Sequence, residues 1–247
     1  MVENERTPMS KFPVAVGAAL ALLLTTSPVS AADAAPAQPD EPHPECPVLA
    51  PPPTAEDLEN YLCGHHRLGP AELPEDGPVG ALLEGYDRLG GLTPVDFLDR
   101  WSTGGDWDYP EHDGFAVEDG RPLKELQELP QGWMLDRFGS AWGSFLAPAG
   151  APYSERALPP DSLSTWPDGP EHNYNCYEVA VPVNAWVGPI APHFEQPGGG
   201  EQLLVPAEEV PEADGDGHVP VNDLLEWGYL DQRPTEDCVL PAGYAEA

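Results

Sequence analysis

Glycine and proline interrupt this chain too often for long regular elements. Its 247 residues include 33 prolines and 25 glycines. Proline fixes its own backbone and removes an amide donor, and glycine marks turns that need unusual backbone angles. From Gly132 onward, short extended stretches alternate with these two residues. We therefore expect short helices and short strands, with most of the sheet in the C-terminal half.

The first residues have the pattern of an export signal. Lys11 precedes an apolar run over 12–25, and small residues follow up to Ala31, which predicts cleavage after Ala31. A retained membrane anchor is the alternative, but the run is short for a membrane span. We expect a signal peptide over 1–31, a Pro/Ala-rich linker over 32–53, and a mature protein that is secreted or held at the cell surface, outside the membrane.

Four cysteines follow the signal: Cys46, Cys63, Cys176 and Cys238. An even number in an oxidising compartment predicts two disulfides. Three pairings are open, and the most local one joins Cys46 to Cys63 and Cys176 to Cys238. A zinc site beside Cys63, with the histidines at 65 and 66, is an alternative that lacks the usual Cys-x-x-Cys spacing, so no metal site is expected.

The charge balance excludes one class of partner. Asp and Glu number 43 against 10 Lys and Arg, which gives a formal net charge of −33. Nucleic-acid backbones require basic patches on their partners, so nucleic-acid binding is not expected. An anionic membrane surface would be repelled for the same reason.

Local patterns predict several elements. Thr54 with Asp57, and Thr93 with Asp96, resemble helix N-terminal caps, so residues 54–128 are expected to form a small accessory domain of short helices and irregular turns. In the C-terminal half, alternating apolar residues over 177–183 predict one strand, with a proline at an edge or bulge. Further expected elements are a strand over 203–206 and a helix over 222–227 that ends at Gly228.

Two arginines stand out in this acidic chain. Between Lys124 and Arg233, Arg137 and Arg156 are the only Lys or Arg residues. The planar guanidinium donates to two oxygens at once, which suits a carboxylate or a phosphate. A substrate clamp is one interpretation. The other is an internal salt bridge at each arginine, since an acidic residue immediately precedes both.

Several ordered blocks around these arginines resemble a known family. The blocks are 135–139, 143–148, 152–160 and 188–200. Together they resemble the tuberculosis necrotizing toxin (TNT) type of NAD glycohydrolase, which includes secreted fungal enzymes. The resemblance implies an α+β catalytic domain over 129–232, with a small twisted antiparallel sheet related to ADP-ribosyltransferase folds, followed by a tail over 233–247.

The resemblance also implies residue roles. Arg137 and Arg156 would bind the pyrophosphate of NAD, and Gln196 would meet the nicotinamide ribose where the bond breaks. Nicotinamide is already a cationic leaving group, so no pair of acidic and basic carboxylates is required, unlike in ordinary glycoside hydrolysis. An oxocarbenium-like ribose gains from aromatic faces and from a polar side chain that orients it or the attacking water.

Further residues are expected to bind substrate. Phe138 and Phe145 would flank the nicotinamide or its ribose, although paired phenylalanines are more often part of a core. Tyr153 and Asp136 are additional candidates for substrate binding.

The chain departs from the family beside Gln196. His193 stands where the family often has an aromatic residue, and Glu195 where it often has glycine; Glu195 is expected to face solvent. The glycines at 198–200 lack the lysine of a phosphate loop and predict a turn with positive φ or a close approach of backbone to ligand. The acidic run over 214–218 hints at a calcium loop but lacks the glutamate that such a loop needs, so a surface turn is expected.

The activity that the resemblance implies is hydrolysis of NAD, and of NADP, to nicotinamide and ADP-ribose or its phosphate. Protein ADP-ribosylation and an inactive nucleotide-binding module are the alternatives. No cofactor is required. A structural calcium ion and a homodimer are carried over from similar secreted enzymes.

Overall fold

The computed structural model describes residues 45–167 and 169–239, which lie in one compact unit, Pro42–Ala247. The expected signal peptide, the linker up to residue 44 and the last eight residues of the tail lie outside the described residues. No helix among the described residues has the length and apolar character needed to cross a membrane.

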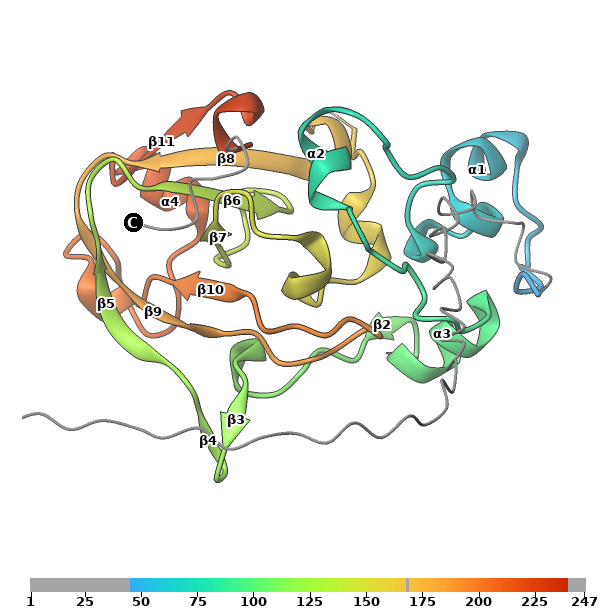
Figure 1. Ribbon diagram of the computed structural model, residues 1–247, viewed down its shortest axis with the longest axis horizontal. Coiled ribbons are helices and arrows are strands. Elements are labelled where there is room, and N and C mark those ends of the chain that lie inside the picture. Colours follow the sequence, from blue (N-terminus) through green and yellow to red (C-terminus); the bar gives the residue numbers. More distant parts are fainter. Residues whose placement is uncertain (1–44, 168, 240–247) are drawn as a thin grey trace, which may run out of the picture. The chain divides into compact units, whose positions relative to one another are not determined.

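Two antiparallel sheets form the centre of this unit (Figure 1). One has the strand order β11-β8-β6-β7, with bounds β6 Met134–Phe138, β7 Ala147–Pro148, β8 Tyr174–Val179 and β11 Leu230–Arg233. The other has the order β10-β9-β5, with bounds β5 Glu125–Leu129, β9 Val183–Pro189 and β10 Glu201–Leu204. An isolated bridge between Leu146 and Leu203 links the end of the first sheet to β10.

The main core lies between the sheets and beneath one helix. Alternate residues of the strands point inward, as the period of two along a strand requires: Val183, Ala185 and Val187 of β9 are buried together with residues of β8. Helix α4 (Val221–Glu226) adds Val221 and Leu224 to the same cluster. Removing this apolar surface from water stabilises the pairing of the sheets.

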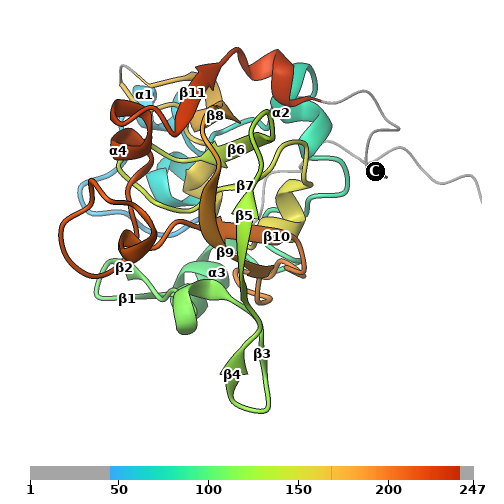
Figure 2. The ribbon, with the colours of Figure 1, turned by 90° about the vertical axis from the view of Figure 1, so that its left-hand side faces the viewer.

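The N-terminal region consists of short helices and two ribbons. Its helices are α1 (Ala55–Asn60), α2 (Gly77–Leu82) and α3 (Pro94–Trp101), and its ribbons are β1 (Ser102–Thr103) with β2 (Asp106–Trp107) and β3 (Val117–Glu118) with β4 (Arg121–Pro122). The β3–β4 hairpin projects away from the sheets (Figure 2).

Short 3-10 helices occur in both halves of the described chain. They occupy Leu62–Gly64, His66–Leu68, His112–Gly114, Tyr153–Arg156, Pro160–Leu163, Glu171–Asn173, Ala207–Glu209 and Thr235–Cys238.

The predicted helix starts are confirmed. The Thr54 hydroxyl accepts from the Asp57 amide (3.1 Å), and the Asp57 carboxylate accepts from the Thr54 amide (2.8 Å), which is a complete capping box. Thr93 caps α3 through the amide of Asp96 (3.1 Å). Gly228 follows α4 with a φ of 77°, the left-handed conformation expected after a helix end.

The single strand predicted over 177–183 is wrong. β8 ends at Val179, and β9 begins at Val183 in the other sheet. The turn between them contains Pro182 and leaves Val181 48% exposed. The alternation of apolar residues therefore continues across a turn, because both strands bury alternate residues in one core.

The boundary drawn between residues 128 and 129 falls inside β5. This strand pairs with β9 along its whole length, from Glu125 opposite Val187 to Leu129 opposite Val183. Phe115 and Ile190 also form a bridge. The N-terminal region and the sheet-rich region thus share a sheet, and the expected mixture of helices with antiparallel sheet is confirmed.

Both disulfides follow the most local pairing. Cys46 bonds to Cys63 and Cys176 bonds to Cys238. The second bond joins β8 to the last 3-10 helix, and its two cysteines are fully buried. With Cys63 in a disulfide, the zinc alternative loses its thiolate ligand, and the described residues hold no cluster of three or more metal-ligating side chains.

Candidate active site

A cavity of about 660 Å³ opens beside β6 and β10. Its walls come from five parts of the chain: β6 and the loop after it up to the start of β7, the segment 156–162, the segment 109–114 of the N-terminal region, Ile190 after β9, and Gln202 of β10. Its volume lies within the range of small-molecule sites. Of the predicted site residues, it brings together Asp136, Arg137, Phe138, Phe145 and Arg156.

Arg137 supplies a positive charge to this cavity. Its Nε donates to the carbonyl of Ser140 (2.9 Å) and its Nη1 to the carbonyl of Phe145 (2.7 Å). Within the described residues it has no carboxylate partner, and burial lowers the pKa of its guanidinium. An anion in the cavity would offset that burial cost, because a nearby opposite charge favours the charged form. Arg137 therefore fits the predicted role of an anion clamp.

Two glycines make room for this guanidinium. A Cβ atom built on Gly139 would lie 2.7 Å from Nη2 of Arg137, and one built on Gly143 would overlap the same atom. The loop is held from its other side by α4, since the amide of Val221 donates to the carbonyl of Gly143 (3.0 Å). Glycine at these positions lets the loop fold closely around Arg137.

Arg156 also lines the cavity, but its guanidinium has a different environment from that of Arg137, and its predicted role as a pyrophosphate clamp stays a prediction. Its guanidinium is bidentate with Asp136, with an Nη2–Oδ2 distance of 2.9 Å, and it also donates twice to the carbonyl of Ala151. Both side chains are nearly inaccessible, at 4% and 0% exposure. Arg156 thus forms the internal salt bridge that was the alternative interpretation, and its partner is Asp136 rather than the neighbouring Glu155.

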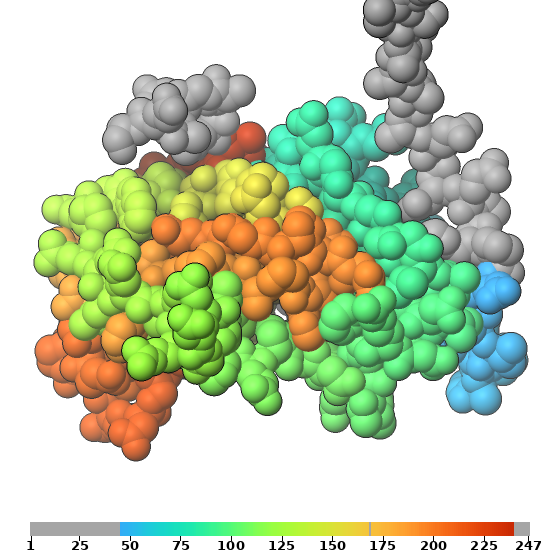
Figure 3. Space-filling view, turned by 60° about the horizontal axis from the view of Figure 1, so that its bottom comes forward, coloured from blue at the N-terminus to red at the C-terminus, as the bar shows by residue number. Residues whose placement is uncertain are grey.

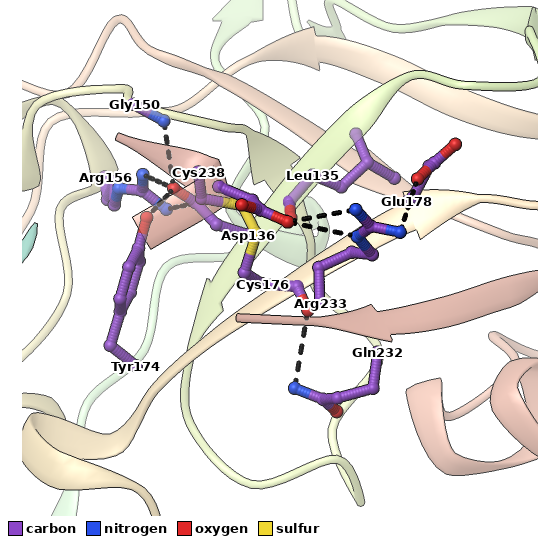
Figure 4. Close-up of a disulfide and its surroundings, with 11 residues drawn as sticks. Leu135, Asp136, Gly150, Arg156, Tyr174, Cys176, Glu178, Gln232, Arg233 and Cys238 are labelled. Carbon is purple, nitrogen blue, oxygen red and sulfur yellow. Dashed lines mark hydrogen bonds and ion pairs between the residues drawn. A yellow bond between two sulfur atoms is a disulfide. The ribbon is translucent and has the colours of Figure 1, made fainter. Parts of the chain in front are cut away.

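Asp136 is the centre of this buried network (Figure 4). Besides Arg156, its carboxylate accepts from the hydroxyl of Tyr174 (2.8 Å) and from the amide of Gly150 (3.1 Å). Burial, and then the charge of Asp136, raise the pKa of Tyr174. On the neighbouring strand, Asp136 pairs with Cys176 of the disulfide. Asp136 therefore supports the cavity floor and has little capacity left for substrate.

Aromatic side chains line the cavity at different depths. Phe138 is 4% exposed and lies beneath the guanidinium of Arg156, 5.2 Å from the ring centre. Phe145 is 42% exposed on the loop after β6. One buried and one accessible phenylalanine thus line the cavity, and their predicted contact with the nicotinamide end stays a prediction.

Tyr153 lies outside the cavity lining, contrary to its prediction as a substrate-binding residue. It is fully buried, its hydroxyl donates to the carbonyl of Pro159 (3.0 Å), and its ring packs edge-on against Phe138 at 4.9 Å. Its role is to support Phe138 from behind.

Gln196 also lies outside the cavity lining, which corrects its predicted catalytic position. Its side chain is 4% exposed, and its amide donates to the carbonyl of Asp87 (2.7 Å) in the N-terminal region. Gln196 therefore joins two distant segments of the fold.

Gln202, which the sequence analysis missed, is the glutamine of the cavity. It lies on β10, and its Nε2 donates to the carbonyl of Asp113 (2.9 Å). Among the described residues, no donor contacts its Oε1. Its sequence signal was its place two residues after the glycine run, at the start of a strand, which could have marked it as a second candidate.

The segment that contains Gln196 packs against the N-terminal region. Figure 3 shows the two regions in contact on one face, the N-terminal region in green and the segment near residue 195 in orange. The ring of His193 packs at a tilt against that of Trp101, with the ring centres 4.4 Å apart. Glu195, expected to face solvent, instead pairs with Arg100 (2.8 Å) and accepts from Trp101 Nε1 (3.1 Å), with 19% of its side chain exposed. Its φ of 59° explains why glycine also suits this position.

Replacing Glu195 with alanine is expected to lower the free energy of unfolding by about 1 kcal/mol. The value is small because Arg100 is 57% exposed and water screens the pair. Chemical denaturation of Glu195→Ala beside Glu208→Ala, an exposed glutamate, measures the difference. Equal stability of the two variants would show that the contacts of Glu195 contribute nothing.

The glycine run forms the predicted turn. Gly198 and Gly199 have φ values of 63° and 87°. A Cβ atom on Gly198 would lie 2.7 Å from the carbonyl oxygen of Ile190, and one on Gly200 would lie 2.9 Å from that of Glu155. The close approach is therefore between two stretches of protein backbone.

Comparisons with known proteins agree with the resemblance. The family model described as "Tuberculosis necrotizing toxin" matches residues 128–232. The conidial surface nicotinamide adenine dinucleotide glycohydrolase nadA of Aspergillus fumigatus is 46% identical over 151 residues, which cover 59% of this chain and 64% of that protein. The match thus spans less than two thirds of the relative's own length.

One solved structure is also similar, that of tuberculosis necrotizing toxin complexed with its immunity factor. The identity is 22%, the TM-score is 0.49, and the match covers 64% of this chain and 87% of that chain. The family match includes β6, the loop after it and β10. Residues 128–232 are thus similar to the tuberculosis necrotizing toxin family.

Proposed function

We propose that the chain is a NAD glycohydrolase, which hydrolyses the bond between nicotinamide and ribose to give nicotinamide and ADP-ribose. The main support is the cavity, which places the uncompensated charge of Arg137 and the side-chain amide of Gln202 on its walls. The printed name of the Aspergillus relative gives the same reaction class. Secretion of the mature protein is part of the proposal, supported by two disulfides and by that relative's place on the conidial surface.

In the proposed reaction, the bond between C1′ of ribose and the ring nitrogen of nicotinamide breaks first. The electron pair moves to that nitrogen, so the cationic ring leaves as neutral nicotinamide without needing an acid. Water then bonds to C1′ of the oxocarbenium-like ribose and releases one proton to solvent. No cofactor takes part in this scheme.

The cavity residues have distinct proposed roles. Arg137 holds the pyrophosphate, which is common to NAD and NADP, so both are proposed substrates. Oε1 of Gln202 accepts a hydrogen bond from a ribose hydroxyl or from the attacking water, because its Nε2 is already engaged. Phe138 and Phe145 contact the nicotinamide end and exclude water from the developing cation.

The test is the release of nicotinamide from NAD, and separately from NADP, by the secreted, disulfide-bonded protein. Chromatography should show nicotinamide and free ADP-ribose in equal amounts. Nicotinamide in excess, with label retained on added protein, would indicate ADP-ribosyl transfer instead. Saturable binding of NAD without release would contradict the proposal and favour a binding module.

A further inference from the structure

The cavity wall contains an unusual turn from the N-terminal region. Three consecutive residues, His112, Asp113 and Gly114, have positive φ values of 57°, 57° and 78°. Such angles are unfavourable for residues with side chains, although Asp and His tolerate them better than most. The surrounding structure must therefore hold the turn in place.

The backbone of this turn holds the cavity glutamine. The carbonyl of Asp113 accepts from Nε2 of Gln202 at 2.9 Å, and both residues line the cavity. A terminal amide rotates easily about its last side-chain bond. Because Nε2 of Gln202 donates to Asp113, the other end of the amide, Oε1, is the atom left for a ligand.

The side chain of Asp113 is held by two other elements. Its Oδ2 lies 3.3 Å from Nε2 of His218, in the turn before α4, and 3.6 Å from Nζ of Lys124, next to β5. Lys124 is itself placed over two rings, 5.0 Å from the centre of Phe115 and 5.1 Å from that of Trp186. The carboxylate thus ties the turn to the segment before α4 and to the residue before β5.

His218 is suited to donate to this carboxylate. Its Nδ1 is buried and has no hydrogen-bond partner in the part of the chain that the structure describes. A neutral imidazole carries one N–H, and with that proton on Nε2 it donates to Asp113. The exposed fractions of the three side chains are 42% for Asp113, 25% for His218 and 21% for Lys124, so the contact is partly open to solvent.

We propose that Asp113 is a positioning residue: its carboxylate, held by His218 and Lys124, fixes the turn whose carbonyl orients Gln202 for the proposed reaction. This inference rests on the proposed function. The Asp113 carboxylate is not proposed to contact substrate. Removing that carboxylate should therefore affect the reaction only through the orientation of Gln202. Substitution of Asp113 should lower the rate of the chemical step and leave substrate binding nearly unchanged.

The first experiment compares substitutions at Asp113 in nicotinamide release from NAD. Asp113→Ala is expected to lower kcat about tenfold with KM changed less than about twofold, because an interaction made in the transition state is weakened. Asp113→Asn is expected to keep more than about half of kcat, since its carbonyl oxygen still accepts from His218. Asp119→Ala is the matched control, an exposed aspartate with a φ of 50° in the β3–β4 turn, expected to leave kcat unchanged.

The second experiment is a double-mutant cycle with Gln202→Ala, measured in single turnovers with enzyme in excess. If Asp113 acts through Gln202, Asp113→Ala causes no further loss in the Gln202→Ala background. The same fold loss in both backgrounds, or a rise in KM at unchanged kcat, would overturn the inference. Thermal unfolding checks each variant, and if Asp113→Ala does not fold, His218→Ala replaces it in the cycle with an expected loss of about threefold.

The two proposals fail in different ways. A folded parent protein that releases no nicotinamide contradicts the proposed function, and the positioning role falls with it. An active parent with additive losses at Asp113 and Gln202 leaves the proposed function intact and overturns the positioning role alone.

Discussion

Gln202→Ala is expected to lower the rate of nicotinamide release about a hundredfold, the usual effect of removing one preorganised polar group from a reaction centre. The physical reason is that Oε1 of Gln202 lies at the cavity with its amide already oriented by Asp113. Water that replaces the side chain would have to be ordered during each turnover. Steady-state kinetics with NAD measures the change, and we expect it in kcat more than in KM.

Gln196→Ala is the matched control, because it makes the same change six residues earlier. It removes the 2.7 Å hydrogen bond to the carbonyl of Asp87, an exposed residue whose carbonyl also accepts from the amide of Gly90 (3.4 Å), so we expect a loss of about 1 kcal/mol in the free energy of unfolding and a near-normal rate per folded molecule. A folded Gln196→Ala protein with the larger loss of rate would return the catalytic role to Gln196 and remove it from Gln202.

Asp136→Asn is expected to lower the free energy of unfolding by about 3–5 kcal/mol, the cost of leaving one partner of a buried ion pair alone. Arg156 would keep its charge at 4% exposure, with an amide where two carboxylate oxygens had been. Tyr174 and the amide of Gly150 would compete for the single remaining acceptor. Denaturant unfolding of the oxidised protein measures the loss.

Two further variants separate pairing from packing in this network. Asp231→Asn, at an exposed position of β11, is expected to change stability by less than about 0.5 kcal/mol. The double variant Asp136→Asn with Arg156→Met is expected to be more stable than Asp136→Asn alone, since it removes the unpaired charge. If the double variant is less stable than the single one, the arginine contributes mainly through packing against Phe138.

Features set by neighbouring residues could be predicted from the sequence. The caps at Thr54 and Thr93 and the turn at Gly228 depend on groups within a few positions of each other. The family resemblance depends on ordered blocks, and the match over 128–232 confirms it. The same blocks singled out Arg137, which lies on the cavity wall.

Features set by distant residues could not be predicted in this way. The segment 177–183, predicted to be one strand, runs from one sheet to the other. Alternating apolar residues indicate which side chains are buried, but they do not indicate which sheet contains them. Arg156 and Gln196 were predicted to contact substrate, but in the structure each is hydrogen-bonded to a residue of the protein, 20 and 109 positions away respectively.

The sequence of this protein therefore determined its short elements, its similarity to one family and the place of one charged residue on the cavity wall. Its tertiary structure alone decided which arginine keeps a free charge and which glutamine reaches the cavity. The physical reason is that a buried polar group must find a partner, and only the folded chain shows whether that partner is another part of the protein or a ligand.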